Sequence, residues 1–368
     1  MFCFKIPNKH RVVIYREFFE DFRSIQNSII KTINKNYIIK NDNINLFCLF
    51  TIFFSINSFK ALICDGLRIS YLVNYINLLN PKLVFTSLDN DPNFYKLKKF
   101  CPDVKFISFQ NGFRRKKNDF FGIVNNNKKL SCDYFYTWGN NITNEYEKYI
   151  KTKYIILGSL KTYFANNYFL NKKKPLIYIS SSKLDMNDKS EYMKQYYTYE
   201  KKLILLLCKY CLSQNIEFVI LKRTSSINEE LYFRGVVQNK IKFIKIPRNK
   251  TIKKYDILGD YEVAVSICSS LGLENLALGR KTVFFPPRVI DKKNMLYGFD
   301  ISWPQKTIDN NLYFFRSPNF KIMSNILNRA IKINTHDWRI RTTKLNKIIL
   351  PPDKNKLDSL LKDLNKYI

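Results

Sequence analysis

The sequence contains few glycines and almost no histidine. Ten glycines in 368 residues exclude a collagen-like or glycine-rich protein, and two histidines are too few for a histidine-rich metal site or a histidine-centred triad. The eight cysteines are scattered, apart from Cys208 and Cys211, whose spacing within an apolar stretch places both on one buried helix face. We therefore expect no metal site, no redox chemistry, and free thiols of the kind found in a reducing cytosol.

Acidic residues are also scarce. The 30 Asp and Glu residues stand against 62 Lys and Arg, which gives a net charge of +32. Hydrophobic residues make up 46% and aromatic residues 15%, enough for packed cores, so the chain is not a disordered polycation. The charge invites a nucleic-acid partner, but no RNP, zinc-finger or helix-turn-helix motif is evident, and an AT-rich coding bias toward lysine accounts for part of it. Specific nucleic-acid binding is therefore only a weak alternative.

Long hydrophobic runs are absent as well. The most apolar segment, residues 45–64, is interrupted by Asn57, Ser58 and Lys60 after about twelve residues, whereas a membrane-spanning helix needs about twenty. No signal-peptide pattern opens the chain. We expect this segment to form a buried helix in a cytoplasmic protein, whose basic surface suits peripheral binding to the anionic inner face of a membrane.

Short apolar runs alternate with helical patterns along the chain. Runs that end in polar residues or glycine predict strands of a parallel sheet at "HRVVIYRE", "PKLVFTSLDND", "DVKFISFQNG", "YFYTWG" and "KYIILGS". After a lysine-rich break over residues 159–174, a second series follows with "PLIYISSS", "IEFVILKR", "KIKFIKIP" and "YEVAVSIC".

The two series predict two facing Rossmann-like α/β domains. We expect an N-terminal domain over residues 1–160, a second domain over 175–300, and C-terminal helices over 301–368 that can pack back on the N-terminal domain. Such domains leave an interdomain cleft at the carboxyl ends of their strands, where ligands are expected.

The segment over residues 263–285 carries the most chemistry. An apolar strand is followed by small and hydroxyl residues and then by a helix, so Ser269, Ser270 and Gly272 lie where backbone N–H groups can hold phosphate oxygens. Glu274 is placed to accept hydrogen bonds from sugar or ribose hydroxyls. In the alternative reading, a serine is simply an N-cap and Glu274 is a first-turn acid that compensates the helix dipole.

Polar residues also follow strands of the first domain. Asp89 and Asp91 are candidates for a general base that takes a proton from an acceptor hydroxyl, with Asn90 between them as an acceptor ligand. Alternatively, Asp89 and Asn90 form a turn or cap the next helix.

A second polar stretch ends the next strand of the first domain. Gln110, Asn111 and Gly112 are candidates for binding the acceptor. Arg114 can neutralise a leaving phosphate or hold an acidic sugar, or it can be a solvated surface residue. In the second domain, Ser180 and Ser181 follow a strand and can donate to a phosphate, or they can form a plain turn.

Several of these motifs together resemble a known family. The strand, "SSLGLE", helix and "ALGRKTVFF" are similar to the donor-binding segment of GT-B glycosyltransferases and of sugar-nucleotide epimerases. With "FTSLDNDPNFYKL", "KFISFQNGFRR", "YFYTWGNN" and "YIILGSLK", the series resembles the O-antigen biosynthesis family of bacterial surface-carbohydrate loci, from about Asn45 to Arg288.

The resemblance implies a GT-B-like cytosolic glycosyltransferase. The N-terminal domain would take a saccharide or lipid-linked acceptor of an O-antigen or capsule-type polysaccharide, and the second domain a nucleotide-sugar donor. Arg223, at the end of "FVILKR", would stabilise the departing nucleotide, and is favoured over Lys222. GT-B enzymes generally act without a metal, so no cofactor is expected despite the "DND" at 89–91. The alternatives are a sugar-nucleotide epimerase or a CDP-alcohol phosphotransferase of the same fold.

Overall fold

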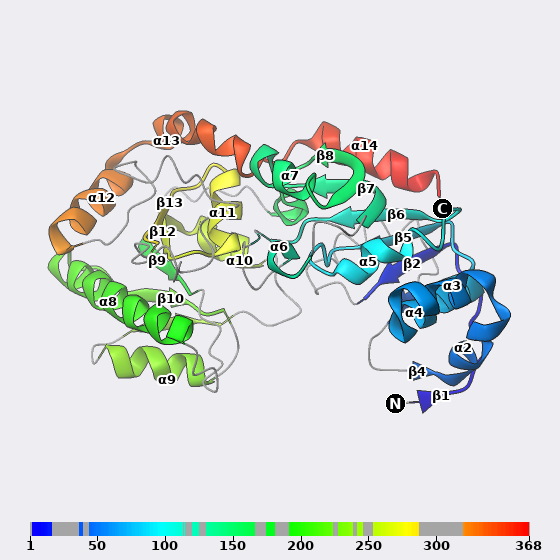
Figure 1. Cartoon of the computed structure of the whole chain (residues 1–368). Coiled ribbons are helices and arrows are strands. Elements are labelled where there is room, and N and C mark those ends of the chain that lie inside the picture. The colour runs from blue at the N-terminus through cyan, green and yellow to red at the C-terminus, as the bar shows by residue number, and fades with distance from the viewer. Residues whose placement is uncertain are drawn as a thin grey trace. The chain divides into compact units, whose positions relative to one another are not determined.

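The chain folds into two compact α/β units, shown in a computed structural model (Figure 1). Unit 1 comprises Met1–Tyr163 with Asp353–Ile368, and unit 2 comprises Phe164–Pro352. The structure describes residues 2–16, 37–39, 44–112, 114, 120–124, 130–165, 174–180, 191–223, 227–237, 241–245, 253–286 and 319–367.

Unit 1 is built on a six-stranded parallel sheet. Its strand order is β3-β2-β5-β6-β7-β8. The strands are β2 (Val12–Tyr15), β3 (Tyr37–Ile39), β5 (Leu83–Thr86), β6 (Lys105–Phe109), β7 (Leu130–Thr137) and β8 (Ile150–Ile156). Every residue of β2 and β5 is buried, as expected for central strands of a parallel sheet that is covered on both faces. A separate pair joins β1 (Phe2–Cys3) to β4 (Ile44–Asn45).

The helices of unit 1 lie between and around these strands. They are α2 (Leu46–Phe50), η1 (Thr51–Phe54), α3 (Ile56–Asp65), α4 (Leu67–Leu79), α5 (Pro92–Leu97), α6 (Phe120–Ile123), α7 (Asn140–Tyr146) and α14 (Lys354–Asn365); η2 (Leu160–Phe164) ends at the unit boundary. Of the C-terminal helices, only α14 belongs to unit 1.

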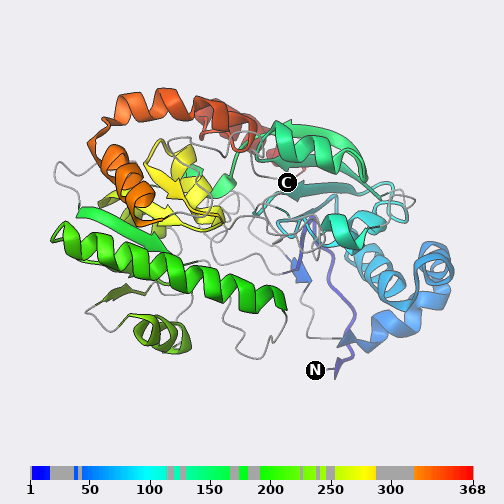
Figure 2. The same cartoon turned by 60° about the vertical axis from the view of Figure 1, so that its left-hand side comes forward.

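Unit 2 contains a five-stranded parallel sheet of order β11-β10-β9-β12-β13. Figure 2 shows the long helix α8 lying along one face of this sheet. The strands are β9 (Lys174–Ile179), β10 (Val219–Leu221), β11 (Lys242–Ile244), β12 (Tyr261–Ser266) and β13 (Thr282–Phe284). The helices are α8 (Glu191–Ser213), α9 (Ile227–Val236), α10 (Lys253–Gly259), α11 (Ser270–Ala277), α12 (Phe320–Lys332), α13 (Thr335–Thr342) and η4 (Thr343–Lys347).

The two cysteines that share a helix are core residues. Cys208 and Cys211 lie on the buried side of α8, as their spacing predicts. Burial raises the pKa of the Cys211 thiol to about 12, so the thiol is protonated and unreactive at neutral pH.

The expectation of one buried helix over residues 45–64 is wrong. Asn45 caps α2, and Ser55 interrupts the chain in an extended conformation and caps α3, so the segment divides into three short helices. In the part of the chain that the structure describes, no single helix is long and apolar enough to cross a membrane. Leu46–Phe54 and Ile56–Asp65 reach that length and composition only as a pair, bent by 99°.

Candidate functional site

The strand order of unit 2 locates its binding edge. The chain leaves β9 toward β10 on one side, and β12 pairs with β9 on the other, so the order reverses between β9 and β12. In open parallel sheets, ligands bind at the carboxyl ends of the strands beside such a reversal. Ser180 follows β9 there, and the turn from Ile267 to Ser269 follows β12.

The turn after β12 is the accessible part of a buried region. The Ser266 hydroxyl accepts a hydrogen bond from the Ser269 N–H at 3.1 Å, which closes the turn. Ser269 is the N-cap of α11, and its hydroxyl accepts from the Leu271 N–H at 3.2 Å. Cys268, Ser269 and Ser270 are partly exposed, whereas the residues of β12 that precede them are almost all buried. The N-terminal end of α11 is therefore accessible at the carboxyl ends of the strands.

Gly272 lets α11 approach β13 closely. A Cβ atom at this position would lie 2.8 Å from two ring atoms of Phe284 and 3.4 Å from the Thr282 Cγ2. Glycine is thus required by packing, and its predicted part in donor binding stays a prediction.

Replacing Gly272 by Ala is expected to lower the free energy of unfolding of unit 2 by about 1–3 kcal/mol, because the buried Phe284 ring must move. Gly235 of α9 is the matched control, since nothing lies within 4 Å of its added Cβ and alanine favours a helix. Urea denaturation of both variants measures the difference. Equal stabilities for the two alanine variants would contradict the packing explanation.

Glu274 is a buried acceptor. Its side chain is part of a residue that is 2% exposed, and its Oε2 accepts a hydrogen bond of 3.0 Å from the Tyr255 hydroxyl of α10. Because Ser269 is the N-cap, Glu274 lies beyond the first turn of α11, and that turn contains no acidic residue. The prediction that Glu274 is a first-turn acid that compensates the helix dipole is therefore wrong. Its role toward a ribose stays a prediction.

The strand ends of β9 and β10 contribute the other donor candidates. Ser180 is 3% exposed, and its N–H donates to the Leu221 carbonyl at 3.1 Å. Ser181 lies outside the described residues. Lys222 is buried, and its Nζ lies 3.3 Å from Glu230 Oε2. Arg223 is exposed, with its N–H bonded to Glu229 Oε1 at 2.9 Å. Of the two cations, Arg223 is the one accessible to a ligand.

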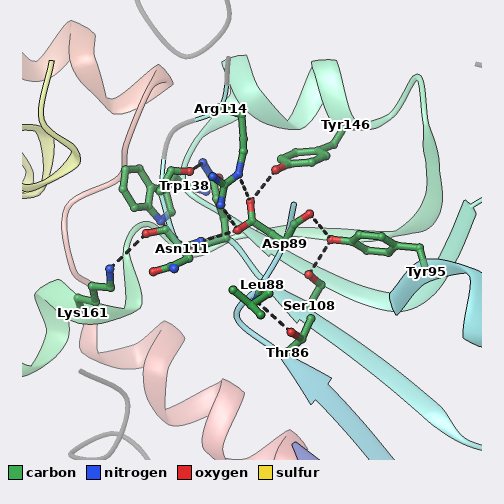
Figure 3. Close-up of polar contacts among 12 residues, drawn as sticks. Thr86, Leu88, Asp89, Tyr95, Ser108, Asn111, Arg114, Trp138, Tyr146 and Lys161 are labelled. Carbon is green, nitrogen blue, oxygen red and sulfur yellow. Dashed lines mark hydrogen bonds and ion pairs between the residues drawn. The ribbon is translucent and has the colours of Figure 1, made fainter. Parts of the chain in front are cut away.

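In unit 1, Asp89 is the centre of a buried polar cluster (Figure 3). Arg114 forms a two-pronged ion pair with it, through Nε to Oδ2 at 2.7 Å and through Nη2 to Oδ1. The Tyr146 hydroxyl donates to Oδ2 at 2.6 Å and the Asn111 N–H to Oδ1 at 3.0 Å. Asp89 itself is 0% exposed.

This geometry favours a structural role for Asp89 over the predicted general base. Both carboxylate oxygens already accept two hydrogen bonds each, and no surface of the residue reaches solvent or substrate. Burial, followed by the Asp89 charge, raises the pKa of Tyr146 well above its usual value, so this phenol is a neutral donor. The same pairing occupies the guanidinium of Arg114 and disfavours the predicted contact between Arg114 and a phosphate or acidic sugar.

Asp91 is the N-cap of α5. Its Oδ1 accepts from the Asn93 N–H at 3.1 Å, and its Oδ2 accepts from the Tyr15 hydroxyl at 2.9 Å. The same oxygen lies 2.9 Å from Nη1 of Arg16. The cap that the sequence placed at Asp89 or Asn90 is therefore found at Asp91. Asn90 beside it is exposed.

Arg16 is a candidate ligand-binding residue that sequence reasoning missed. It follows β2 at the point where the strand order of unit 1 reverses between β2 and β5, and it has a positive φ of 60°. Its position at the end of the buried run "VVIY" was the available signal.

Gln110 joins the ends of β6 and β7. Its Oε1 accepts from the Trp138 N–H at 2.7 Å, and its Nε2 donates to the Gly112 carbonyl at 2.8 Å. With an exposure of 3%, it is a structural residue. Asn111 and Gly112 are partly exposed, and the Asn111 carbonyl accepts from Lys161 Nζ at 3.3 Å. The Asn111 Oδ1 has no hydrogen-bond partner among the described residues, so it is the better acceptor-binding candidate.

A further titratable group lies within unit 2. Glu200 of α8 is 0% exposed, and its Oε1 accepts from the hydroxyls of Tyr178 at 2.8 Å and Tyr196 at 3.5 Å. Burial, with the nearby Glu229 charge, raises its pKa to about 7. Sequence reasoning missed this site because Tyr178, which makes the shorter of the two hydrogen bonds, lies 22 residues away on β9.

Comparison with solved structures defines the class of fold. The chain is similar over 98% of its length to 99% of a glycosyltransferase from Rickettsia africae, with 13% identity and a TM-score of 0.50. It is similar over 95% of its length to 99% of the UDP-GlcNAc 2-epimerase from Neisseria meningitidis bound to UDP-GlcNAc, with 8% identity and a TM-score of 0.53. It is also similar over 98% of its length to 90% of the wall teichoic acid polymerase TagF with CDPG, with 10% identity and a TM-score of 0.50. The predicted GT-B-like fold of two α/β units is confirmed.

Comparison with family models defines the family. Residues 107–366 match the model described as "putative O-antigen biosynthesis protein". The chain belongs to this family, and the resemblance seen in its motifs is confirmed. No curated protein sequence matches the chain significantly.

Proposed function

We propose that the protein is a glycosyltransferase that moves a sugar from a nucleotide-sugar donor to a saccharide or lipid-linked acceptor of an O-antigen or capsule-type polysaccharide. The observation that carries the proposal is the turn after β12, where Ser269 and Ser270 open α11 at the strand-order reversal of unit 2. Backbone N–H groups and the dipole of a helix opening favour a phosphate. The solved relatives that bind UDP-GlcNAc or contain CDPG support this class of ligand.

Within this proposal the residues have distinct roles. The opening of α11 would hold the donor phosphates, and the exposed Arg223 would stabilise the negative charge that develops on the departing nucleotide. The partly exposed Asn111 and Gly112 and the exposed Asn90 would bind the acceptor. Asp89 and Asp91 would hold these loops in place. We propose that the reaction requires no metal and no cofactor. We also propose that the protein is cytoplasmic and contacts the membrane peripherally.

The direct test is a binding screen against UDP-, GDP-, CMP- and dTDP-sugars, followed by turnover with mass identification of the transferred group. Arg223→Ala is expected to weaken binding of the selected nucleotide by about 10- to 100-fold, the usual effect of losing one charge-assisted hydrogen bond. Arg341→Ala, another exposed arginine of unit 2, is the control and should leave affinity unchanged. A protein that binds none of the nucleotide sugars would refute the proposal.

An epimerase and a CDP-alcohol phosphotransferase are the alternatives that the solved relatives favour. An epimerase would isomerise the sugar nucleotide without any acceptor, which proton NMR detects. A phosphotransferase would release CMP from a CDP-alcohol, and the mass of the product identifies the transferred group.

Turnover in excess EDTA should persist, because no metal is part of the proposed chemistry.

A further inference from the structure

The helices α2 and α3 present large apolar side chains to the outside. Twelve of the eighteen exposed large hydrophobic side chains among the described residues lie between Phe2 and Leu67, and these include all six exposed phenylalanines. Phe53 is 68% exposed, Phe54 is 77% and Ile56 is 75%. The apolar patch is defined here by Phe4, Phe50, Phe53, Phe54, Ile56 and Ile63. Exposed apolar surface that is concentrated in this way marks an interaction site.

Helix α3 buries a polar residue and exposes large apolar ones. Its polar Ser58 is fully buried, with its hydroxyl bonded to Ser55 Oγ at 2.9 Å and to Asn74 Oδ1 of α4 at 3.3 Å. The Ser70 hydroxyl of α4 donates to the Ser58 carbonyl at 2.7 Å. Ile56 and Ile63 of the same helix face outward. The buried face of α3 is therefore made of the small residues Ser58 and Ala61, and its large apolar side chains lie on the exposed face.

Hydrogen bonds and ring contacts hold the segments that carry the apolar patch in place. Asn45 caps α2, and its Nδ2 donates to the Lys5 carbonyl at 2.7 Å, which fastens the N-terminal segment to the helix. Asn74 Nδ2 holds the end of α2 through the Cys48 carbonyl at 2.7 Å. The rings of Phe50 and Phe54 lie 5.9 Å apart. Figure 1 shows α2 and α3 grouped with α4 at one end of unit 1.

Exposed cations lie on the same segments as the apolar patch or next to them in the sequence. Lys5, Lys9, Lys60 and Arg68 are exposed, whereas the one acid of α3, Asp65, is paired with Lys96 at 3.4 Å. Exposed apolar side chains combined with exposed cations on the same segments are the pattern of a surface that lies in the interface of an anionic membrane.

We propose that the apolar patch docks into an anionic lipid bilayer, with Phe50, Phe53 and Phe54 inserted below the headgroups and the exposed lysines and Arg68 of the same segments on the phosphates. The bent pair of helices would lie in the interface and would not cross the membrane. A second copy of the chain fits this surface less well, because a symmetric contact would bring the same cations together in a protein of net charge +32. The inference rests on the peripheral membrane contact of the proposed function and names the surface that makes it, but vesicle binding needs no sugar nucleotide, so it can fail or succeed separately from the transferase activity.

Vesicle co-sedimentation tests the docking. The full chain should bind phosphatidylcholine vesicles that contain one quarter phosphatidylglycerol, and Phe53→Ser/Phe54→Ser should lower the partition coefficient by about tenfold or more. Leu205→Ser/Leu212→Ser, which removes two exposed apolar side chains of α8, is the matched control and should bind as the wild type does. Binding by the wild type should weaken but persist in 1 M salt, because salt screens only the charges.

Insertion is measured directly with Phe53→Trp and, as a control, Leu212→Trp. Brominated lipids should quench the added fluorescence of the first variant and leave that of the second unchanged. The proposal is overturned if Phe53→Ser/Phe54→Ser binds vesicles like the wild type, or if salt abolishes all binding. It is also overturned if the wild type ignores vesicles and sediments as a dimer that this double variant converts to a monomer.

Discussion

Replacing Asp89 by Asn is expected to lower the free energy of unfolding of unit 1 by about 3–5 kcal/mol, the usual cost of breaking a buried ion pair. The amide would leave the Arg114 guanidinium as an uncompensated charge in a site where Asp89 is 0% exposed. The Tyr146 hydroxyl and the Asn111 N–H now donate to the carboxylate, and the amide would turn its own N–H₂ donor toward at least one of them. Urea denaturation followed by tryptophan fluorescence measures the loss, with the buried Trp138, which is bonded to Gln110, as a reporter in unit 1.

A surface ion pair provides the control for Asp89→Asn. The Glu145 carboxylate lies 2.9 Å from Lys148 Nζ, and these side chains are 33% and 57% exposed, so Glu145→Gln should cost less than about 1 kcal/mol. If Asp89 were instead the general base, Asp89→Asn would lower kcat and leave stability nearly unchanged. A stability loss no larger than that of the control would therefore refute the structural role.

Replacing Glu200 by Gln is expected to stabilise unit 2 above pH 7 by up to about 3 kcal/mol. Burial raises the folded-state pKa of Glu200 to about 7, from an ordinary value of 4.5. The folded protein therefore holds this proton more tightly than the unfolded chain does, and stability falls as the pH rises from 4.5 through 7. Below pH 4.5 the carboxyl is neutral in both states, and its replacement should matter little.

The pH dependence is read from the difference between variant and wild type. Glu229, whose charge raises the pKa, and the hydroxyls of Tyr178, Tyr196 and Tyr232, which favour the ionised form, remain in both proteins. Their contributions therefore cancel in the difference, as do those of other titrating groups. Glu217→Gln, at an exposed pair with Lys242, should show no such pH trend. A stability difference for Glu200→Gln that is the same at pH 5 and pH 8 would exclude the raised pKa.

The sequence was sufficient to predict most strands of the two large sheets, although β3 and the pair of β1 and β4 were not predicted. Runs such as "VVIY" and "LVFT" are wholly apolar because they are buried on both faces, and this pattern is local. The hydroxyl residues before α11 were equally readable, since an N-cap depends on its immediate neighbours.

The environment of Asp89 was beyond sequence reasoning. Its partners Arg114 and Tyr146 follow at 25 and 57 residues along the chain, and only the tertiary fold brings them to one carboxylate. The predicted orientation of α3 was wrong for the same reason. Its apolar residues suggested burial, but Ser58 forms buried hydrogen bonds with α4, and the large side chains of Ile56 and Ile63 face outward.

The division of unit 1 between the two ends of the chain affects how the protein can fold during synthesis. Helix α14, whose Leu360 and Leu364 are buried and whose Lys356 Nζ donates to the Ile156 carbonyl at 3.1 Å, is translated only after all of unit 2. Residues 1–163 therefore emerge from the ribosome without this helix, whereas the contiguous unit 2 has its whole sequence by Pro352. Unit 2 can reach its native state first, and a fragment cut after Tyr163 would keep an uncovered surface where α14 belongs.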